Sequence, residues 1–89
     1  MIVRELMINN KSGLHARPAT LWVQAASKFQ STIRLKKADR EVDGKSMLAV
    51  LSLGLSAGSS VQLTVDGPDA EAAADTLTRL IADLAAKGE

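Results

Sequence analysis

The stretch from residue 13 to residue 29, GLHARPATLWVQAASKF, decides the fold of this chain of 89 residues. From Leu21 onward its apolar residues recur at intervals of three and four, the spacing that places side chains on one face of a helix. Pro18 suits the first turn of such a helix, because its missing N–H has no intrahelical acceptor there. The stretch therefore predicts an amphipathic helix from residue 16 to about residue 28, with His15 at or beside its N-cap.

Strands are predicted on both sides of this helix. The chain shows rough alternation of apolar and polar residues before the helix and cleaner alternation after it, bounded by clusters of turn residues. Such patterns are typical of half-buried strands. We expect strands at residues 2–8, 32–36, 40–42 and 61–65. The second and third are close enough in sequence to form a hairpin.

Two more helices complete the pattern. Ser46 is a favourable N-cap for a short helix over residues 47–53. Residues 69–86 predict a longer helix that starts with Asp69 and is followed by Lys87, as the helix dipole favours. The order is then β-α-β-β-α-β-α. Because the elements are apolar mainly on one face, we predict an α+β fold of two layers, in which three helices cover one face of a four-stranded antiparallel sheet.

Composition limits the classes of function. With 46% hydrophobic and 24% charged residues, the chain is expected to form one compact domain over residues 1–89. It has no cysteine and one histidine, which excludes disulfides, cysteine nucleophiles and metal sites with several histidines. We expect no metal and no cofactor. The charged first residues and the lack of a long apolar run predict a cytoplasmic protein without membrane insertion.

The net charge of +1 hides an asymmetry between the two halves. Residues 1–45 carry nine Lys and Arg against four Asp and Glu, whereas residues 46–89 carry two against six. A basic half suits an anionic partner. Positive charges gather in the predicted hairpin, at Arg34, Lys36, Lys37 and Arg40. The aromatic residues, Trp22 and Phe29, are both expected on the apolar helix face, where no base could stack on them, so we interpret the cluster as a solvated hairpin.

Two short motifs fail on their structural context. Residues 54–58, GLSAG, match the pattern of a serine nucleophile elbow, but that motif needs a strand before it and a helix after it, the reverse of the order here. Residues 44–46, GKS, match the end of a P-loop, but the first glycine of that motif would fall on Asp39. Serine-triad catalysis and P-loop nucleotide binding are therefore not expected.

His15 marks the strongest candidate site. The first N–H groups of a helix lack internal partners and attract phosphate, and the guanidinium of Arg17 adds a planar set of donors. Gly13 permits close approach of the backbone. An imidazole near its ordinary pKa is largely neutral at neutral pH, so one ring nitrogen is free to attack phosphorus, and this combination suggests phosphoryl transfer without a metal. From these residues alone, a purely structural N-cap histidine remains an equal alternative.

Residues 13–20, GLHARPAT, resemble the active-site signature of HPr, the histidine-containing phosphocarrier family of the bacterial sugar phosphotransferase system. Residues 45–53, KSMLAVLSL, resemble the family's second signature, around a regulatory serine. The resemblance covers essentially the whole chain and implies an open-faced β-sandwich. It implies that His15 accepts a phosphoryl group on Nδ1 from phosphorylated enzyme I and donates it to sugar-specific IIA components, as a carrier and not an enzyme. Arg17 and the backbone N–H groups of Ala16 and Arg17 would stabilise the phosphate.

The resemblance also implies a docking surface and a regulatory site. Family partners dock on the first two helices, which corresponds here to Ala16, Thr20, Leu21, Gln24, Met47, Leu48 and Leu51, beside Arg17 and Ser46. Ser46 matches the serine that HPr kinase/phosphorylase modifies in Gram-positive relatives, which would link the protein to a catabolite-control transcriptional regulator and to carbon catabolite regulation. We expect a monomer. Two alternatives stay open: the nitrogen-related branch of the phosphotransferase system, and a non-catalytic interaction or nucleic-acid-binding module.

Overall fold

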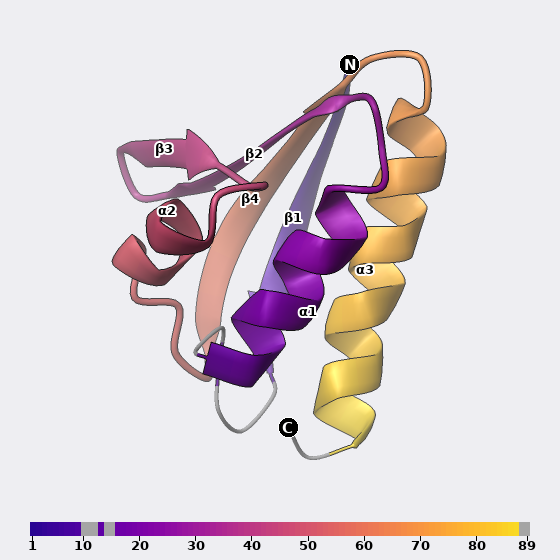
Figure 1. Cartoon of the computed structure of the whole chain (residues 1–89). Helices are drawn as coiled ribbons and strands as arrows, with labels where there is room; N and C mark the ends of the chain where they lie inside the picture. Colours follow the sequence, from indigo (N-terminus) through magenta and orange to yellow (C-terminus); the bar gives the residue numbers. More distant parts are fainter. Residues whose placement is uncertain (10–12, 14–15, 88–89) are drawn as a thin grey trace.

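The structure, a computed structural model, describes residues 1–9, 13 and 16–87. In chain order its elements are β1 (Ile2–Ile8), α1 (Ala16–Ala26), β2 (Thr32–Lys37), β3 (Arg40–Asp43), α2 (Met47–Ser52), β4 (Ser59–Asp66) and α3 (Ala70–Ala86). The strands form one antiparallel sheet in the order β1-β4-β2-β3. Figure 1 shows α1 and α3 side by side over one face of this sheet, with α2 beside β3. The predicted two-layer α+β fold is confirmed.

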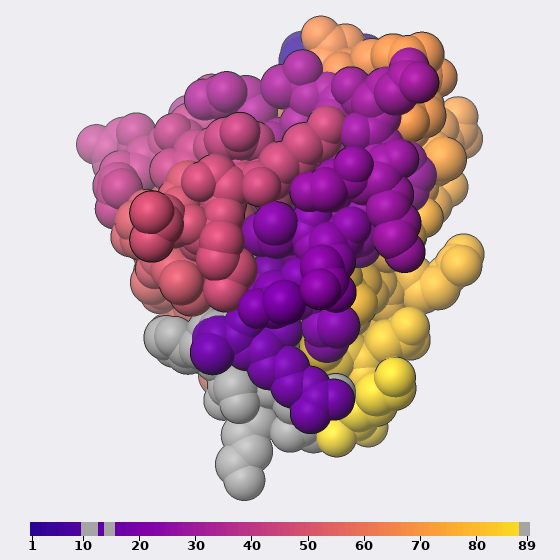
Figure 2. All heavy atoms as spheres, viewed as in Figure 1, coloured from indigo at the N-terminus to yellow at the C-terminus, as the bar shows by residue number. Residues whose placement is uncertain are grey.

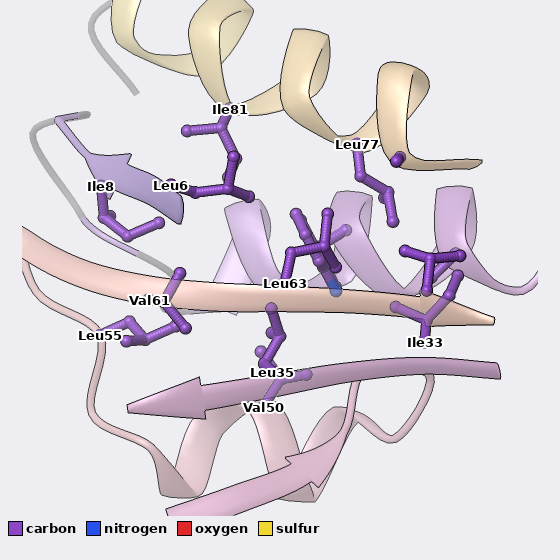
Figure 3. Close-up of a cluster of buried hydrophobic side chains, with 14 of the residues drawn as sticks. Leu6, Ile8, Ile33, Leu35, Val50, Leu55, Val61, Leu63, Leu77 and Ile81 are labelled. Carbon is purple, nitrogen blue, oxygen red and sulfur yellow. The ribbon is translucent and has the colours of Figure 1, made fainter. Parts of the chain in front are cut away.

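The hydrophobic core lies between the sheet and the helices. Alternate strand residues face it, because successive side chains of a strand point to opposite faces. In α3 the buried residues recur at intervals of three and four, as expected for one face of a helix. Figure 3 shows how side chains from the strands, α2 and α3 meet in this core. The fully buried large side chains are Trp22, Ile8, Ile33, Leu35, Leu55, Leu63, Leu77, Leu84, Val50, Val61 and Val65.

On the other face of the sheet lies no helix of the described residues, and one row of polar side chains crosses the four strands. Glu5, Gln62, Lys36 and Glu41 are cross-strand neighbours in register over the four strands. The side chains of Glu5, Lys36 and Glu41 are exposed. This face is therefore open to water, as the sequence predicts.

Several element ends differ from the sequence prediction by one or two residues. α1 ends at Ala26 and not near residue 28, because the N–H groups of Lys28 and Phe29 donate to carbonyls three residues back, which tightens the chain into a turn. β4 begins at Ser59, two residues earlier than expected, because its first two serines pair with β1. Polar residues at strand ends carry no hydrophobic alternation, so only the backbone pairing reveals them.

Asp69 has a different role from the one expected at the start of α3. It is the N-cap residue, but its side chain makes no capping hydrogen bond with the helix. Its carboxylate instead accepts hydrogen bonds from the backbone N–H groups of Gln30 and Ser31, each at 2.9 Å, and from the Ser31 hydroxyl at 2.5 Å. The carboxylate thus ties α3 to the turn between α1 and β2.

These hydrogen bonds predict an acid-sensitive contribution to stability. The Ser31 hydroxyl and the Gln30 N–H hold the pKa of the Asp69 carboxyl below its ordinary value of 3.8. A carboxyl with a lowered folded pKa stabilises the fold above its unfolded pKa, and this stabilisation is lost as the pH falls through the folded value. We expect Asp69→Asn to lose less stability than the wild type between pH 5 and pH 2 in thermal unfolding. Asp83→Asn, which removes an exposed carboxylate of α3 and leaves the hydrogen bonds of Asp69 in place, is the control. If Asp69→Asn and the wild type lose equal stability between pH 5 and pH 2, the stabilising role of the Asp69 carboxylate is refuted.

Candidate functional site

The predicted phosphate site begins at the N-terminus of α1. His15 and Leu14 lie outside the described residues, so the residues around them define the site. Ala16 and Arg17 form the first turn of α1 and are exposed, while Pro18 and Ala19 turn into the core. The N–H groups of a first turn have no carbonyl partner within the helix and carry its positive dipole end. The first turn of α1 is therefore an anion-attracting helix end that also carries the Arg17 side chain.

Gly13 lies three residues before the start of α1. It is buried and has a φ of +62°, in the left-handed region that favours glycine. A Cβ at this position would collide with the carbonyl oxygen of Leu55 and would lie 2.8 Å from the Cα of Ser56. Gly13 thus packs backbone against backbone on the segment that follows α2. Glycine was expected here for close approach to a ligand, and the structure shows close approach to the chain itself.

Ser46 caps α2, as predicted. Its hydroxyl oxygen accepts a hydrogen bond from the Ala49 N–H at 3.3 Å, and its carbonyl accepts one from the Val50 N–H at 2.9 Å. The side chain is half-buried. The hydroxyl is therefore at the positive end of a short helix, where a negative charge is electrostatically favoured.

The residues predicted to form a docking surface come from α1 and α2 and are all exposed or half-buried. Figure 2 shows the atoms of these two helices adjoining on one face of the molecule. Leu48 is 81% exposed and Leu51 37%, which is unusual for leucine, whereas Val50 on the same helix is fully buried. We call the set the docking surface: Ala16, Thr20, Leu21, Gln24, Met47, Leu48 and Leu51.

Trp22 connects the two helices in a way that the sequence did not indicate. The sequence predicted Trp22 only as a core residue, and it is fully buried. Its indole Nε1–H also donates a hydrogen bond to the carbonyl of Gly44, at 3.0 Å, in the turn before α2. Periodicity predicts that an indole is buried, but it cannot tell which carbonyl the indole N–H will meet.

The basic cluster of the hairpin is largely engaged with the protein itself. The Arg34 guanidinium pairs with Glu41 at 2.9 Å. Lys37 donates to the carbonyl of Gly54 at 3.1 Å, and Arg40 donates to the carbonyl of Ser52 at 2.9 Å. The interpretation as a purely solvated hairpin was thus incomplete, because two of these cations bind carbonyls at the C-terminal end of α2.

The described residues form neither a metal-binding cluster nor a membrane-spanning helix. Over residues 1–9, 13 and 16–87, no three His, Cys, Asp or Glu side chains gather in a way that could hold a metal ion. In the same part of the chain, no helix has the length and apolar character needed to cross a bilayer.

Comparison with known proteins identifies the family. Residues 2–83 match the model of the PTS HPr component phosphorylation site. The chain is 42% identical over 89 residues to the phosphocarrier protein HPr of Cupriavidus necator, with both chains fully covered. It is also similar to a crystal structure of HPr from Thermoanaerobacter tengcongensis, with a TM-score of 0.93, 44% identity and 97% of each chain covered.

A second structure from Thermoanaerobacter tengcongensis, described as an HPr dimer, has a TM-score of 0.75 and 47% identity, with 88% of this chain and 90% of that chain covered. The expected monomeric state of the present chain therefore stays a prediction. The matched residues, the identity over the full length and the shared fold agree. The chain belongs to the HPr family of the phosphotransferase system, and it is a phosphocarrier protein and not a catalytic enzyme.

Proposed function

We propose that His15 carries the phosphoryl group, which it accepts from phosphorylated enzyme I and donates to sugar-specific IIA components. The Nδ1 lone pair of His15 attacks phosphorus, a new P–N bond forms, and the P–N bond to enzyme I breaks with its electron pair left on the departing nitrogen. The observation that carries this proposal is the helix start itself: the residue after His15 opens α1, and the exposed Arg17 lies in the same turn. Helix N–H groups and a guanidinium stabilise charge on the equatorial oxygens of a phosphoryl group in transfer.

The docking surface supports transfer between proteins. A phosphoryl group passes from one histidine to another only when the two proteins bring their reacting nitrogens together. The exposed Leu48 and Leu51 give apolar area on α2, which contacts α1, and such anchors contribute most when they enter a pocket of the partner. We propose that enzyme I and the IIA components use this same surface in turn, as a monomeric carrier in the cytoplasm would require.

The experiment that tests this function supplies the phosphoryl donor directly. The protein is incubated with phosphoenolpyruvate, magnesium and purified enzyme I, and its intact mass is measured before and after mild acid. We expect one acid-labile phosphoryl group, located by fragmentation to the peptide that contains residues 13–20. If no group is acquired from an enzyme I that charges another carrier, the interaction-module alternative takes its place, and its binding to nucleic acid would be checked by salt dependence.

Phosphorylation of Ser46 would slow this transfer. A phosphate there is favoured by the N-terminal end of α2, but it places negative charge next to Met47 of the docking surface. We expect Ser46→Asp to slow transfer from phosphorylated enzyme I by roughly tenfold. Two like charges near a protein surface repel each other by on the order of 1 kcal/mol or more. The measurement is the steady-state rate at several enzyme I concentrations.

The control for this prediction is Ser46→Asn. Asparagine keeps an oxygen that can cap α2 and has nearly the size of aspartate, but it carries no charge. Wild-type rates for Ser46→Asn together with slow rates for Ser46→Asp would assign the effect to charge. Equal rates for the two variants would rule out the repulsion.

A further inference from the structure

The short helix α2 depends on other elements for its position. It has six residues, Met47–Ser52, and Val50 is its buried residue. Isolated helices shorter than about 12 residues are marginal in water, so tertiary contacts must hold α2 in place. Since Leu48 and Leu51 of the docking surface belong to this helix, the contacts that hold α2 also decide where that surface lies.

The C-terminal end of α2 is held by the hairpin. Arg40 donates to the Ser52 carbonyl at 2.9 Å and to the Ser52 hydroxyl at 3.2 Å, and Lys37 donates to the Gly54 carbonyl at 3.1 Å. The last carbonyls of a helix have no internal donors, and cations are favourable beside them. This end of the helix is thereby fixed to β2 and β3.

The N-terminal end of α2 is held by the turn of residues 43–46, which we call the pre-α2 turn. Gly44 lies at its centre and is buried. Its N–H donates to the Ile33 carbonyl of β2 at 2.7 Å, and its carbonyl accepts from the Trp22 indole of α1 at 3.0 Å. The next residue, Lys45, donates its ammonium to the Phe29 carbonyl at 2.7 Å. The turn is therefore held to β2 on one side and to α1 and the turn after it on the other.

We propose that Trp22 is a positioning residue, whose indole hydrogen bond to Gly44 sets the placement of α1 relative to α2. The bond joins a donor and an acceptor that are both buried, so any displacement of α1 from the pre-α2 turn leaves two polar groups without water or partner. A wholly apolar side chain at this position could fill the core but could not resist that displacement. The inference rests on the proposed function in one respect: partners must contact both helices at once.

The test removes the indole N–H donor of Trp22 and keeps the shape of the side chain. Trp22 is replaced by β-(3-benzothienyl)alanine, in which sulfur takes the place of the indole N–H, and in parallel by Trp22→Phe. Hydrogen exchange of the α2 backbone amides is then followed by NMR. We expect α2 amides to exchange about tenfold faster in both variants, because loss of a buried hydrogen bond lowers the cost of local opening. Ile81→Val is the control: Ile81 is a buried residue of α3 that lies well away from Val50 of α2 (Figure 3), so this variant weakens the core and should leave the local exchange of α2 unchanged.

Transfer kinetics give the second measurement. With phosphorylated enzyme I as donor, we expect the KM of the Trp22 variants to rise roughly three- to tenfold with kcat unchanged, because binding must first restore the placement of α2. Unchanged α2 exchange in the sulfur analogue, or a fall in kcat at constant KM, would overturn the proposal. If the wild type is not phosphorylated at all, the proposed function fails, and the exchange experiment still decides the role of Trp22.

Discussion

His15→Ala is expected to abolish phosphorylation by enzyme I and phosphoenolpyruvate completely. Alanine has no nucleophilic nitrogen, and the sequence contains no second histidine that could accept the group in its place. The helix end and Arg17 would remain, but they only stabilise a phosphoryl group and cannot bond to it. The measurement is intact mass after incubation, with the wild type charged under the same conditions.

The matched control for this loss is Ser46→Ala. Ser46 is the other residue for which phosphorylation is proposed, and its replacement should leave the acid-labile label on the protein. Both variants must show the wild-type near- and far-ultraviolet circular dichroism, so that an unfolded chain is not mistaken for an unreactive one. A label that persists in His15→Ala would exclude His15 as the carrier and require another acceptor.

Gly13→Ala is expected to destabilise the fold by roughly 2–5 kcal/mol. An alanine at positive φ costs about 1–2 kcal/mol, and forcing a methyl group into a packed site costs about 1–3 kcal/mol more. Here the methyl group would overlap the Leu55 carbonyl oxygen and lie 2.8 Å from the Ser56 Cα, and these backbone atoms cannot rotate away as a side chain can. For a domain of this size the melting temperature should fall by more than about 10 °C in thermal unfolding.

Gly54→Ala separates the cost of an alanine at positive φ from the cost of the backbone contact. Gly54 has the same φ of +62°, but nothing lies within 4 Å of a Cβ at that position. The Gly54→Ala variant should therefore lose only about 1–2 kcal/mol of stability, the cost of an alanine at positive φ. A difference between the two variants measures the backbone contact of Gly13, and equal losses would show that the contact relaxes at no cost.

Patterns in the sequence predicted burial well. The spacing of apolar residues predicted the element order, and Trp22 is fully buried, as its position on the apolar helix face predicted. The Ser46 cap was predictable because the capping bond is local, from a residue three positions along the chain. Predictions succeeded where the interaction connects near neighbours or depends only on facing the core.

Contacts between distant polar groups could not be predicted in this way. Trp22 meets a carbonyl 22 residues away, Lys37 meets one 17 residues away, and Asp69 bonds a turn 38 residues before it. Each partner is set by the packing of whole elements, and no local pattern encodes it. The role of His15 rests on the sequence, the family and its neighbours in the chain, and it stays a prediction until a phosphoryl group on His15 is detected.

The dependence of α2 on other elements also has a consequence for the order of folding. Its anchors come from α1, β2 and β3, so they exist only after those elements have assembled, and six residues cannot nucleate a helix unaided. We expect the contacts of α2 to form after the rate-limiting step, so that substitutions in α2 act chiefly on the unfolding rate. The exposed leucines of this helix could therefore change over evolution to suit new partners without slowing the formation of the fold.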